Sequence, residues 1–338
     1  MLDPIRAALA DISQQFHDNR TQRFQVEAVS MEKSRCRLTG NVLDKATLDS
    51  VTAELATHFP RLVFDTSGVE ILRQATPKHL VVVTNVTGLH SKPDFRSEMM
   101  DQLLTGTVVE QLIVTGNWVF IRLADGYLGW VYKNYLRNAV SSQSTHYICA
   151  PVSLLRESPK KESPISGRLL GGTAVCVIDS NDGFVCVSTT GQIEGWLPVD
   201  HLRPQETLPS TPTGQRSQMI QDCDTFVGIP YLWGGSTAYG FDCSGFVRLI
   251  HKLSGILIPR DADMQFTAGK PVEPPFQPGD LLFFGSTSGH RSISHVGMSL
   301  GGWTIIHSSR PNNGVYEDDV ENTGWLSDIF VGARTFIL

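Results

Sequence analysis

The sequence contains no run of basic residues and no long hydrophobic stretch. Its 28 Lys and Arg are outnumbered by 34 Asp and Glu, giving a formal net charge of -6 and a pI near 5.9. Phosphate backbones are bound by clustered positive charge, so this balance argues against a general affinity for nucleic acid. The apolar stretches, such as the one around 80–83, fall short of the roughly 20 residues that cross a bilayer. We therefore expect a protein that binds neither nucleic acid nor membrane.

The cysteines lack the spacing of a metal site. Six are scattered along the chain, with no CxxC pair and no Cys/His cluster, so neither a structural metal nor a cofactor is expected. Most are expected to be reduced thiols in the core. The opening MLDPIRAALADISQQF carries acids and no apolar core of the secretory kind, which favours the cytoplasm. A leader removed by processing would leave a periplasmic or secreted location open. A monomer is expected.

A chain of 338 residues exceeds what one hydrophobic core serves, and 30 Gly with 18 Pro suit turn-rich β structure. Residues 1–78 are predicted to form a small α/β module. Apolar spacing predicts helices over 4–17 and 46–59, and strands over 24–29, 36–43, 62–64 and 69–72.

The middle of the chain contains an internal repeat. Six positions recur 66 residues later, among them Gly129 and Trp130, which match Gly195 and Trp196. Each copy alternates short strands with Gly/Asn/Asp turns and ends in a Gly-Trp strand, a pattern typical of a small β-barrel. The copies, 79–140 and 145–203, resemble bacterial SH3-like domains through GYLGW and QIEGW. The alternative is that these barrels serve only as structural spacers or tethers.

A boundary follows the second copy. The segment 204–214, within RPQETLPSTPTG, is rich in Pro, Thr and Ser and is predicted to be a linker. From residue 215 to 338 the pattern changes to helices followed by several strands. This indicates one α+β domain with a core of its own.

Cys243 is the strongest candidate nucleophile. It opens a helix whose apolar stripe includes Phe246, Val247 and Ile250, and a glycine-rich loop precedes it. Unpaired backbone N–H groups and the helix dipole favour a thiolate at such a position, so we expect a lowered thiol pKa. A buried, inert cysteine is the alternative.

A thiol nucleophile needs a base and a group that orients the base. SHVGMSLGGWTIIHSS reads as a hairpin in which His295 and His307 point to the same side. These two side chains are therefore the predicted base and its partner. His251, expected on the polar side of the Cys243 helix, and His290, in a loop, are expected to take no part in catalysis.

Taken together, PYLWGG, DCSGF, PGDLLFF, HVGM and IIHSS resemble the NlpC-type family of papain-like cysteine peptidases over about 215–338. With SH3-like domains ahead of the peptidase, the chain is similar to γ-D-glutamyl-L-diamino acid endopeptidases. The resemblance implies a multidomain protein: a small α+β N-terminal unit, two SH3-like β-barrels and a C-terminal α+β papain-like domain.

The resemblance also implies roles for individual residues. Cys243 would attack the γ-D-glutamyl carbonyl, His295 would move the proton and His307 would hold its ring. The Cys243 backbone N–H is a candidate oxyanion donor, and the Tyr231 hydroxyl would contact the reacting region. The residues expected to line the substrate groove are Asp242, Ser244, Arg260 and Asp261.

Substrate choice is implied by charge. Glu98 and Tyr127, both in the first barrel, match the positions that finish the groove in similar proteins, and Glu98 with Asp242 would bind the free amino group of L-Ala. A solvated loop acid and a barrel-core tyrosine are the alternatives for this pair.

We therefore expect hydrolysis of the bond between D-Glu and a diamino acid in murein peptides with a free N-terminal L-Ala. Such peptides are products of cell-wall recycling. Two other functions stay open at this point. One is an endopeptidase acting on intact peptidoglycan with the barrels as anchors, and the other is a catalytically silent wall-binding protein.

Overall fold

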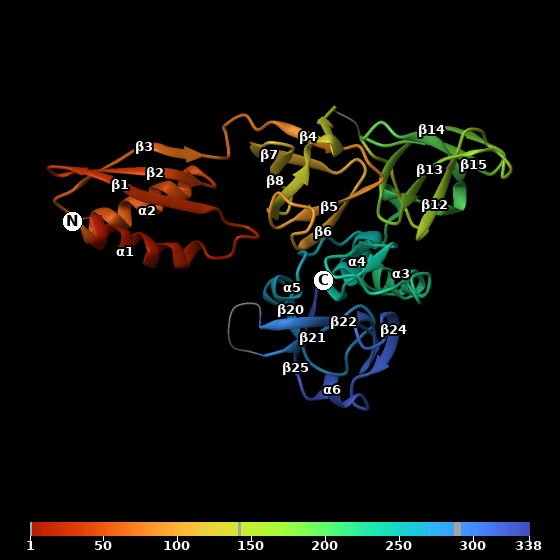
Figure 1. Cartoon of the computed structure of the whole chain (residues 1–338). Helices are drawn as coiled ribbons and strands as arrows, with labels where there is room; N and C mark the ends of the chain where they lie inside the picture. The colour runs from red at the N-terminus through yellow and green to blue at the C-terminus, as the bar shows by residue number, and fades with distance from the viewer. Residues whose placement is uncertain (1, 141–142, 287–291) are drawn as a thin grey trace. The chain divides into compact units, whose positions relative to one another are not determined.

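The computed structural model describes residues 2–140, 143–286 and 292–338. The chain divides into two compact units, Met1–Leu80 with Val109–Lys133 and Val81–Val108 with Asn134–Leu338. This division passes through the first sequence repeat. Figure 1 traces the elements along the chain by colour. No helix among the described residues is long and apolar enough to span a bilayer.

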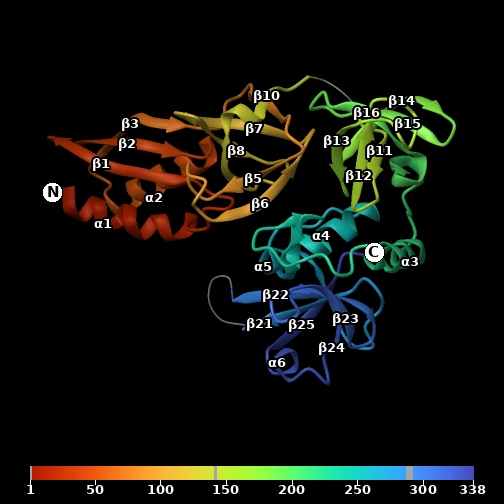
Figure 2. The same ribbon diagram turned by 45° about the vertical axis from the view of Figure 1, so that its right-hand side comes forward.

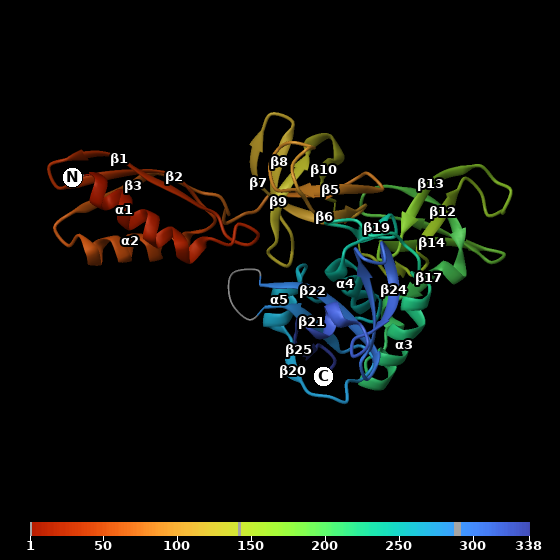
Figure 3. The ribbon, with the colours of Figure 1, turned by 60° about the horizontal axis from the view of Figure 1, so that its bottom comes forward.

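The N-terminal module consists of a three-stranded sheet with two helices. Its elements are α1 (Leu2–Ser13), η1 (Gln14–Phe16), β1 (Phe24–Glu32), β2 (Arg35–Val42), α2 (Lys45–His58) and β3 (Val63–Ile71). Both helices cover the same face of the sheet β1-β2-β3 (Figures 1 and 3). Alternate residues of β1 and β2, such as Val26, Ala28 and Leu38, are buried against them because side chains alternate across a strand. The two strands predicted over 62–72 are one strand, β3.

The same compact unit joins this module to the middle strands of the first repeat. Leu43 packs with Phe120, Leu128 and Trp130, and the Leu128 N–H donates to the Arg20 carbonyl oxygen at 2.7 Å. The aromatic rings of Phe120 and Trp130 lie 5.0 Å apart. The N-terminal module is therefore held to these strands by apolar packing.

The two repeats contain the same series of strands along the chain. The first contains β4 (His79–Val82), β5 (Val86–His90), β6 (Met99–Leu104), β7 (Val108–Thr115), β8 (Trp118–Arg122), β9 (Leu128–Tyr132), η2 (Lys133–Tyr135) and β10 (Leu136–Asn138). The second contains β11 (His146–Ile148), β12 (Val152–Arg156), β13 (Ile165–Leu170), β14 (Ala174–Asn181), β15 (Phe184–Ser188), β16 (Glu194–Pro198), η3 (Val199–His201) and β17 (Leu202–Pro204).

The register repeats with the offset found in the sequence. Val86 pairs with Leu104 in β5–β6, and Val152 pairs with Leu170 in β12–β13, so both partners are displaced by 66 residues. The β7–β8–β9 pairs recur in β14–β15–β16 with the same offset, including the irregularity in the long strand. The strands of the second repeat form one seven-stranded sheet.

The C-terminal domain is a six-stranded antiparallel sheet of order β20-β25-β21-β22-β23-β24 with helices on both sides. After η4 (Gln205–Thr207), its elements are α3 (Pro212–Asp224), β18 (Ser236–Thr237), β19 (Gly240–Phe241), α4 (Cys243–Leu253), α5 (Ala262–Ala268), β20 (Lys270–Val272), β21 (Leu281–Gly285), β22 (Ile293–Gly301), β23 (Thr304–Ser309), β24 (Gly314–Asp319), α6 (Gly324–Ser327) and β25 (Phe330–Thr335). Figure 2 shows α4 and α5 on one side of the sheet and α6 on the other. Helix α3 begins inside the segment predicted as a linker.

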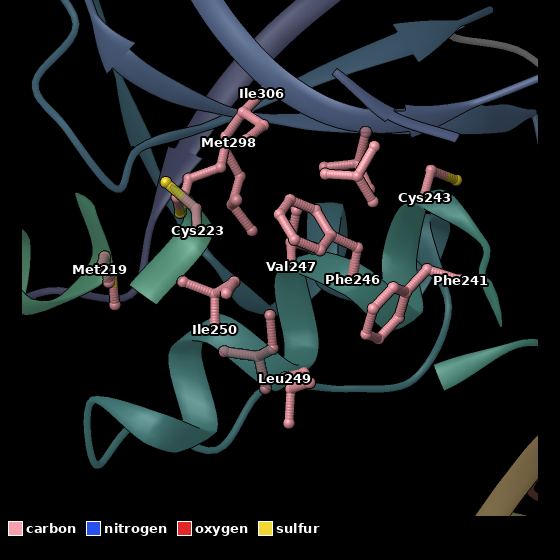
Figure 4. Packing of buried hydrophobic residues seen from close by; sticks show 14 of the residues in the cluster. Met219, Cys223, Phe241, Cys243, Phe246, Val247, Leu249, Ile250, Met298 and Ile306 are labelled. Carbon is pink, nitrogen blue, oxygen red and sulfur yellow. The ribbon is translucent and has the colours of Figure 1, made fainter. Parts of the chain in front are cut away.

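Helix α4 is the centre of the larger core cluster of this domain. Phe246, Val247, Ile250 and Leu253 are fully buried, each contributing about 1.5–3 kcal/mol relative to exposure. Figure 4 shows Phe246, Val247 and Ile250 packed beneath the sheet, with Cys243 at the edge of the cluster and its sulfur turned away from it. The helix that carries the candidate nucleophile is thus fixed by its apolar face.

Candidate active site

Cys243 is the first residue of α4, as the sequence predicts. Asp242 caps the helix by accepting a hydrogen bond from the Gly245 N–H at 2.7 Å. The preceding loop makes two close approaches. Gly234 has a φ of +72°, and a Cβ there would lie 2.1 Å from the Met99 carbonyl oxygen. A Cβ on Gly245 would lie 2.2 Å from the Gly235 carbonyl oxygen. Glycine is therefore required for the tight fit around the helix start.

The two predicted histidines meet on the same side of the β22–β23 hairpin. His295 Nε2 lies 2.7 Å from His307 Nδ1, and His307 Nε2 lies 2.8 Å from Asp318 Oδ2 on β24. Asn312 also donates to this carboxylate oxygen, at 2.9 Å. The three side chains form a continuous hydrogen-bonded row from β22 through β23 to β24.

Burial keeps the thiol and the imidazoles neutral. Burial, reinforced by the Asp242 carboxylate, raises the pKa of Cys243 to about 12, although the backbone N–H groups of Val296 and Ser244 act in the opposite direction. Burial and the neighbouring His307 lower the pKa of His295 to about 3. Burial also lowers the pKa of His307, against the effect of Asp318. The prediction of a lowered thiol pKa is therefore wrong, because desolvation of the thiolate outweighs the helix start.

Aromatic rings surround the histidine pair. Trp325 of α6 stacks on His307, with centroids 6.2 Å apart and an interplanar angle of 14°, and lies 5.8 Å from His295. On another side, the ring of Phe284 is 5.7 Å from that of His295. These rings limit the rotation of His295, and His307 is completely buried.

Asp242 and Arg260 form a buried ion pair. Arg260, 1% exposed, donates to both carboxylate oxygens of Asp242 at 2.7 and 3.1 Å and to Ser244 Oγ at 2.9 Å. Asp242 also accepts from the Gly234 N–H. The two charges are thus paired with each other, and both residues position the start of α4. The substrate-groove roles predicted for Asp242 and Arg260 stay predictions.

This ion pair continues into the first repeat. Asp101 on β6 accepts from Arg260 Nε at 2.9 Å and from Arg248 at 2.9 Å, and the Ser236 hydroxyl donates to it at 2.7 Å. Burial alone would raise the pKa of Asp101, but the two guanidinium groups hold it below its usual value. Asp261, the remaining predicted groove residue, lies 3.9 Å from Arg260 and is partly exposed.

Glu98 and Tyr231 lie near the loop ahead of the nucleophile. Glu98 is exposed and accepts a hydrogen bond from Trp233 Nε1 at 3.0 Å. The Tyr231 N–H is bonded to the Asn313 carbonyl oxygen, and Tyr231 bridges to Phe241, two residues before Cys243. Burial raises the pKa of Tyr231, and a negative charge on the Cys243 sulfur would raise it further, which is consistent with a hydroxyl near the reacting group.

Tyr127 belongs to the other compact unit and is 3% exposed. It precedes β9, and its backbone N–H donates to the Asp125 carboxylate at 3.1 Å. The substrate role predicted for Tyr127 stays a prediction. Of the other histidines, His251 is completely buried and not on a polar face as predicted, because it packs against Phe336. His290 lies outside the described residues.

Sequence reasoning missed three side chains around the site. Asp318 and Trp325 contact the histidine pair, and Arg310 lies over the rings of Tyr231 and Trp233. An acid that alternates onto the buried side of the strand after IIHSS is a weak signal for Asp318. Trp325 and Arg310 have no comparable signal, because only the fold brings them to the site.

Comparison with known proteins gives consistent matches. Residues 228–334 match the NlpC/P60 family, and residues 89–136 match the bacterial dipeptidyl-peptidase SH3 domain. The chain is 34% identical over 227 residues to a gamma-D-glutamyl-L-lysine dipeptidyl-peptidase of Bacillus subtilis, covering 63% of this chain and 73% of the relative. A Bacillus cereus protein of the same name is 28% identical over 255 residues, covering 71% of this chain and 76% of the relative.

Among solved structures, an NlpC/P60 family protein from Bacillus cereus has a TM-score of 0.68. It is 24% identical in sequence, and the match covers 77% of this chain and 100% of that protein. Together with the family matches to 89–136 and 228–334, this likeness confirms the predicted multidomain architecture.

Proposed function

Because this chain belongs to the NlpC/P60 family of cysteine peptidases, we propose that it hydrolyses the γ-D-glutamyl–diamino acid bond of murein peptides that carry a free N-terminal L-Ala. The observation that carries the proposal is the row His295–His307–Asp318, which begins one residue before Val296, whose backbone N–H faces the sulfur of Cys243 at the start of α4. The names of the two Bacillus relatives support the choice of bond.

The row of hydrogen bonds defines which nitrogen can act as the base. The Asp318 carboxylate accepts the proton of His307 Nε2, so the neutral His307 is left with an acceptor at Nδ1. That nitrogen accepts the proton of His295 Nε2, so His295 keeps a lone pair at Nδ1. The base is therefore prepared before the substrate binds.

Catalysis then starts from two neutral groups. The Cys243 thiol gives its proton to His295 Nδ1 as the sulfur attacks the γ-carbonyl carbon. The carbonyl oxygen becomes negative near the Cys243 backbone N–H and the Tyr231 hydroxyl, which are the proposed oxyanion donors. His295 returns the proton to the leaving amine as the C–N bond breaks. Water then hydrolyses the thioester, with His295 as base.

Recognition of the free amine is assigned to the exposed acid beside the site. Glu98 is held by the indole N–H of Trp233, in the loop that leads to Cys243, and the charge of Asp242 is already paired with Arg260. The ammonium of L-Ala would donate a charge-assisted hydrogen bond to the Glu98 carboxylate. Asp261 is partly exposed on the same segment as Arg260, and it stays a proposed groove residue.

A pair of peptides tests the proposal. The enzyme should release L-Ala-γ-D-Glu from L-Ala-γ-D-Glu-diaminopimelate or its Lys analogue, and acetylation of the L-Ala amine should abolish most of this activity. Cys243→Ala should be inactive on all peptides. Equal rates on free and acetylated peptides would contradict the free-amine requirement. Release of fragments from intact peptidoglycan at comparable rates would favour the wall-degrading alternative.

A further inference from the structure

Arg310 is an exposed cation placed over two aromatic rings of the site. It follows β23, three residues after His307, and its guanidinium carbon lies 4.9 Å from the Trp233 ring centroid and 5.5 Å from that of Tyr231. Stacking on two rings holds a long side chain that would otherwise be mobile. The two rings therefore define the position of the guanidinium.

The other cations near α4 are already paired. Arg260 donates to Asp242 and Asp101, and Arg248 donates to Asp101. By contrast, the structure pairs Arg310 with no carboxylate among residues 2–140, 143–286 and 292–338. Its planar set of N–H donors is suited to bind a carboxylate through two parallel hydrogen bonds.

Arg310 is close to the reacting group through Tyr231. The Tyr231 backbone forms a β-bridge with Phe241, just ahead of Cys243. The pKa of the Tyr231 hydroxyl depends on charge at both the Cys243 sulfur and the Arg310 guanidinium. Trp233 connects two opposite charges: Arg310 lies over its ring, and Glu98 accepts from its Nε1. The loop before the nucleophile thus presents an anion and a cation on the same indole.

A γ-linked glutamyl residue has a feature that ordinary peptides lack. Because its side-chain carboxyl forms the peptide bond, its α-carboxylate stays free and lies only a few bonds from the carbonyl that is attacked. The L-Ala ammonium is attached through the α-nitrogen of the same residue. Such a substrate therefore carries an ammonium and a carboxylate close together, matching Glu98 and Arg310.

We propose that Arg310 binds the free α-carboxylate of the γ-linked D-glutamate and selects against peptides in which this carboxylate is an amide. The inference rests on the proposed function and adds a determinant of substrate choice to it. An amide carries no charge and presents an N–H₂ group toward the guanidinium, so it loses the charge-assisted pair and one of the two hydrogen bonds.

Binding and cleavage are measured separately. Calorimetry with Cys243→Ala compares the dipeptide L-Ala-γ-D-Glu with its α-amide, and steady-state kinetics compare the corresponding tripeptides on an otherwise wild-type enzyme. The expected preference for the free carboxylate is about 10- to 100-fold in both Kd and kcat/KM. Arg310→Gln should remove this preference by weakening only the carboxylate ligands, and Arg310→Lys should retain part of it.

Arg168→Gln is the matched control, since Arg168 is an exposed arginine on β13 of the second repeat. It should leave both ligands unaffected. If Arg310→Gln weakens binding and cleavage equally for the carboxylate and the amide ligands, Arg310 only supports the two rings. That result would overturn the inference. So would the absence of any preference, or of any dipeptide binding, in Cys243→Ala. A preference in binding without cleavage of either tripeptide would instead refute the proposed function and leave the inference standing.

Discussion

Asp318 determines the protonation pattern of the two histidines, although it has no contact with the nucleophile in the structure. Its carboxylate can only accept, so it fixes the proton of His307 on Nε2. An amide at this position could equally donate to His307 and reverse the direction of the row. Asp318 is therefore a positioning residue, which acts on His295 through His307.

Asp318→Asn should lower kcat about 10- to 100-fold while KM changes little, since outer partners of a catalytic histidine act on its orientation and basicity. The pH profile of kcat should also change shape, because the His307 tautomer is no longer fixed. Steady-state kinetics between pH 5 and 9 measure both effects. Asn312→Ala removes a neighbouring donor and keeps the carboxylate, so it should retain most of the activity. A change in KM with kcat unaffected would contradict the positioning role.

The thiol illustrates what sequence can and cannot predict at this scale. Cys243 as nucleophile and His295 with His307 as partners follow from a helix stripe and a two-residue strand period, both of which are local patterns. The direction of the Cys243 pKa does not, since it depends on how completely the folded domain removes the sulfur from water. The pairing of Asp242 with Arg260 was missed for the same reason, because no local pattern connects a helix cap to a residue 18 positions later.

Strand β6 is the element that connects the first repeat to the nucleophile helix. Asp101 in its centre is 1% exposed and lies between two guanidinium groups, one from α4 and one from the segment before α5. Arg260, held in this way, holds the cap residue Asp242. The barrel strand is therefore part of the support of the active site, in addition to any role in substrate binding.

Asp101→Asn should destabilise this unit by about 3–5 kcal/mol, because it leaves the buried Arg260 and the partly exposed Arg248 without their shared carboxylate. Urea denaturation followed by tryptophan fluorescence, together with hydrogen exchange of α4, measures the effect. The control is Asp94→Asn in the same repeat, whose partner Arg96 is 90% exposed. Loss of that surface pair should cost at most about 1 kcal/mol. Equal losses in the two variants would refute a supporting role for the buried pair.

At the scale of the whole molecule, the repeat was the most predictable feature. An offset of 66 residues in the sequence returns as the same offset in strand register, since the Gly-Trp strands and the turns between them recur together. The separate packing of the N-terminal module was less predictable. Leu43 and Arg20, which belong to no repeat or motif, contact β8 and β9. Long-range packing of this kind leaves no periodic trace.

The C-terminal domain buries His251 and His307 and partly buries His295, all in the neutral form, and this links its stability to pH. Burial lowers the pKa of His251 to about 4 and that of His295 to about 3, and it also lowers the pKa of His307. In the unfolded chain the same groups take up a proton near pH 6.5. Below that pH the unfolded state binds more protons than the folded state, so the free energy of unfolding decreases as the pH falls.

Between pH 7 and 5.5, His251 and His295 should each reduce the free energy of unfolding by about 1 kcal/mol, and His307 should act in the same direction. Urea denaturation at the two pH values measures the sum. His251→Asn removes one of these groups and can retain the hydrogen bond to the Val247 carbonyl oxygen, so the decrease should become smaller by about 1 kcal/mol. His79→Asn changes an exposed histidine on β4 and should keep the wild-type decrease. A wild-type stability that does not change over this range would mean that the buried imidazoles accept protons without unfolding, contrary to their burial.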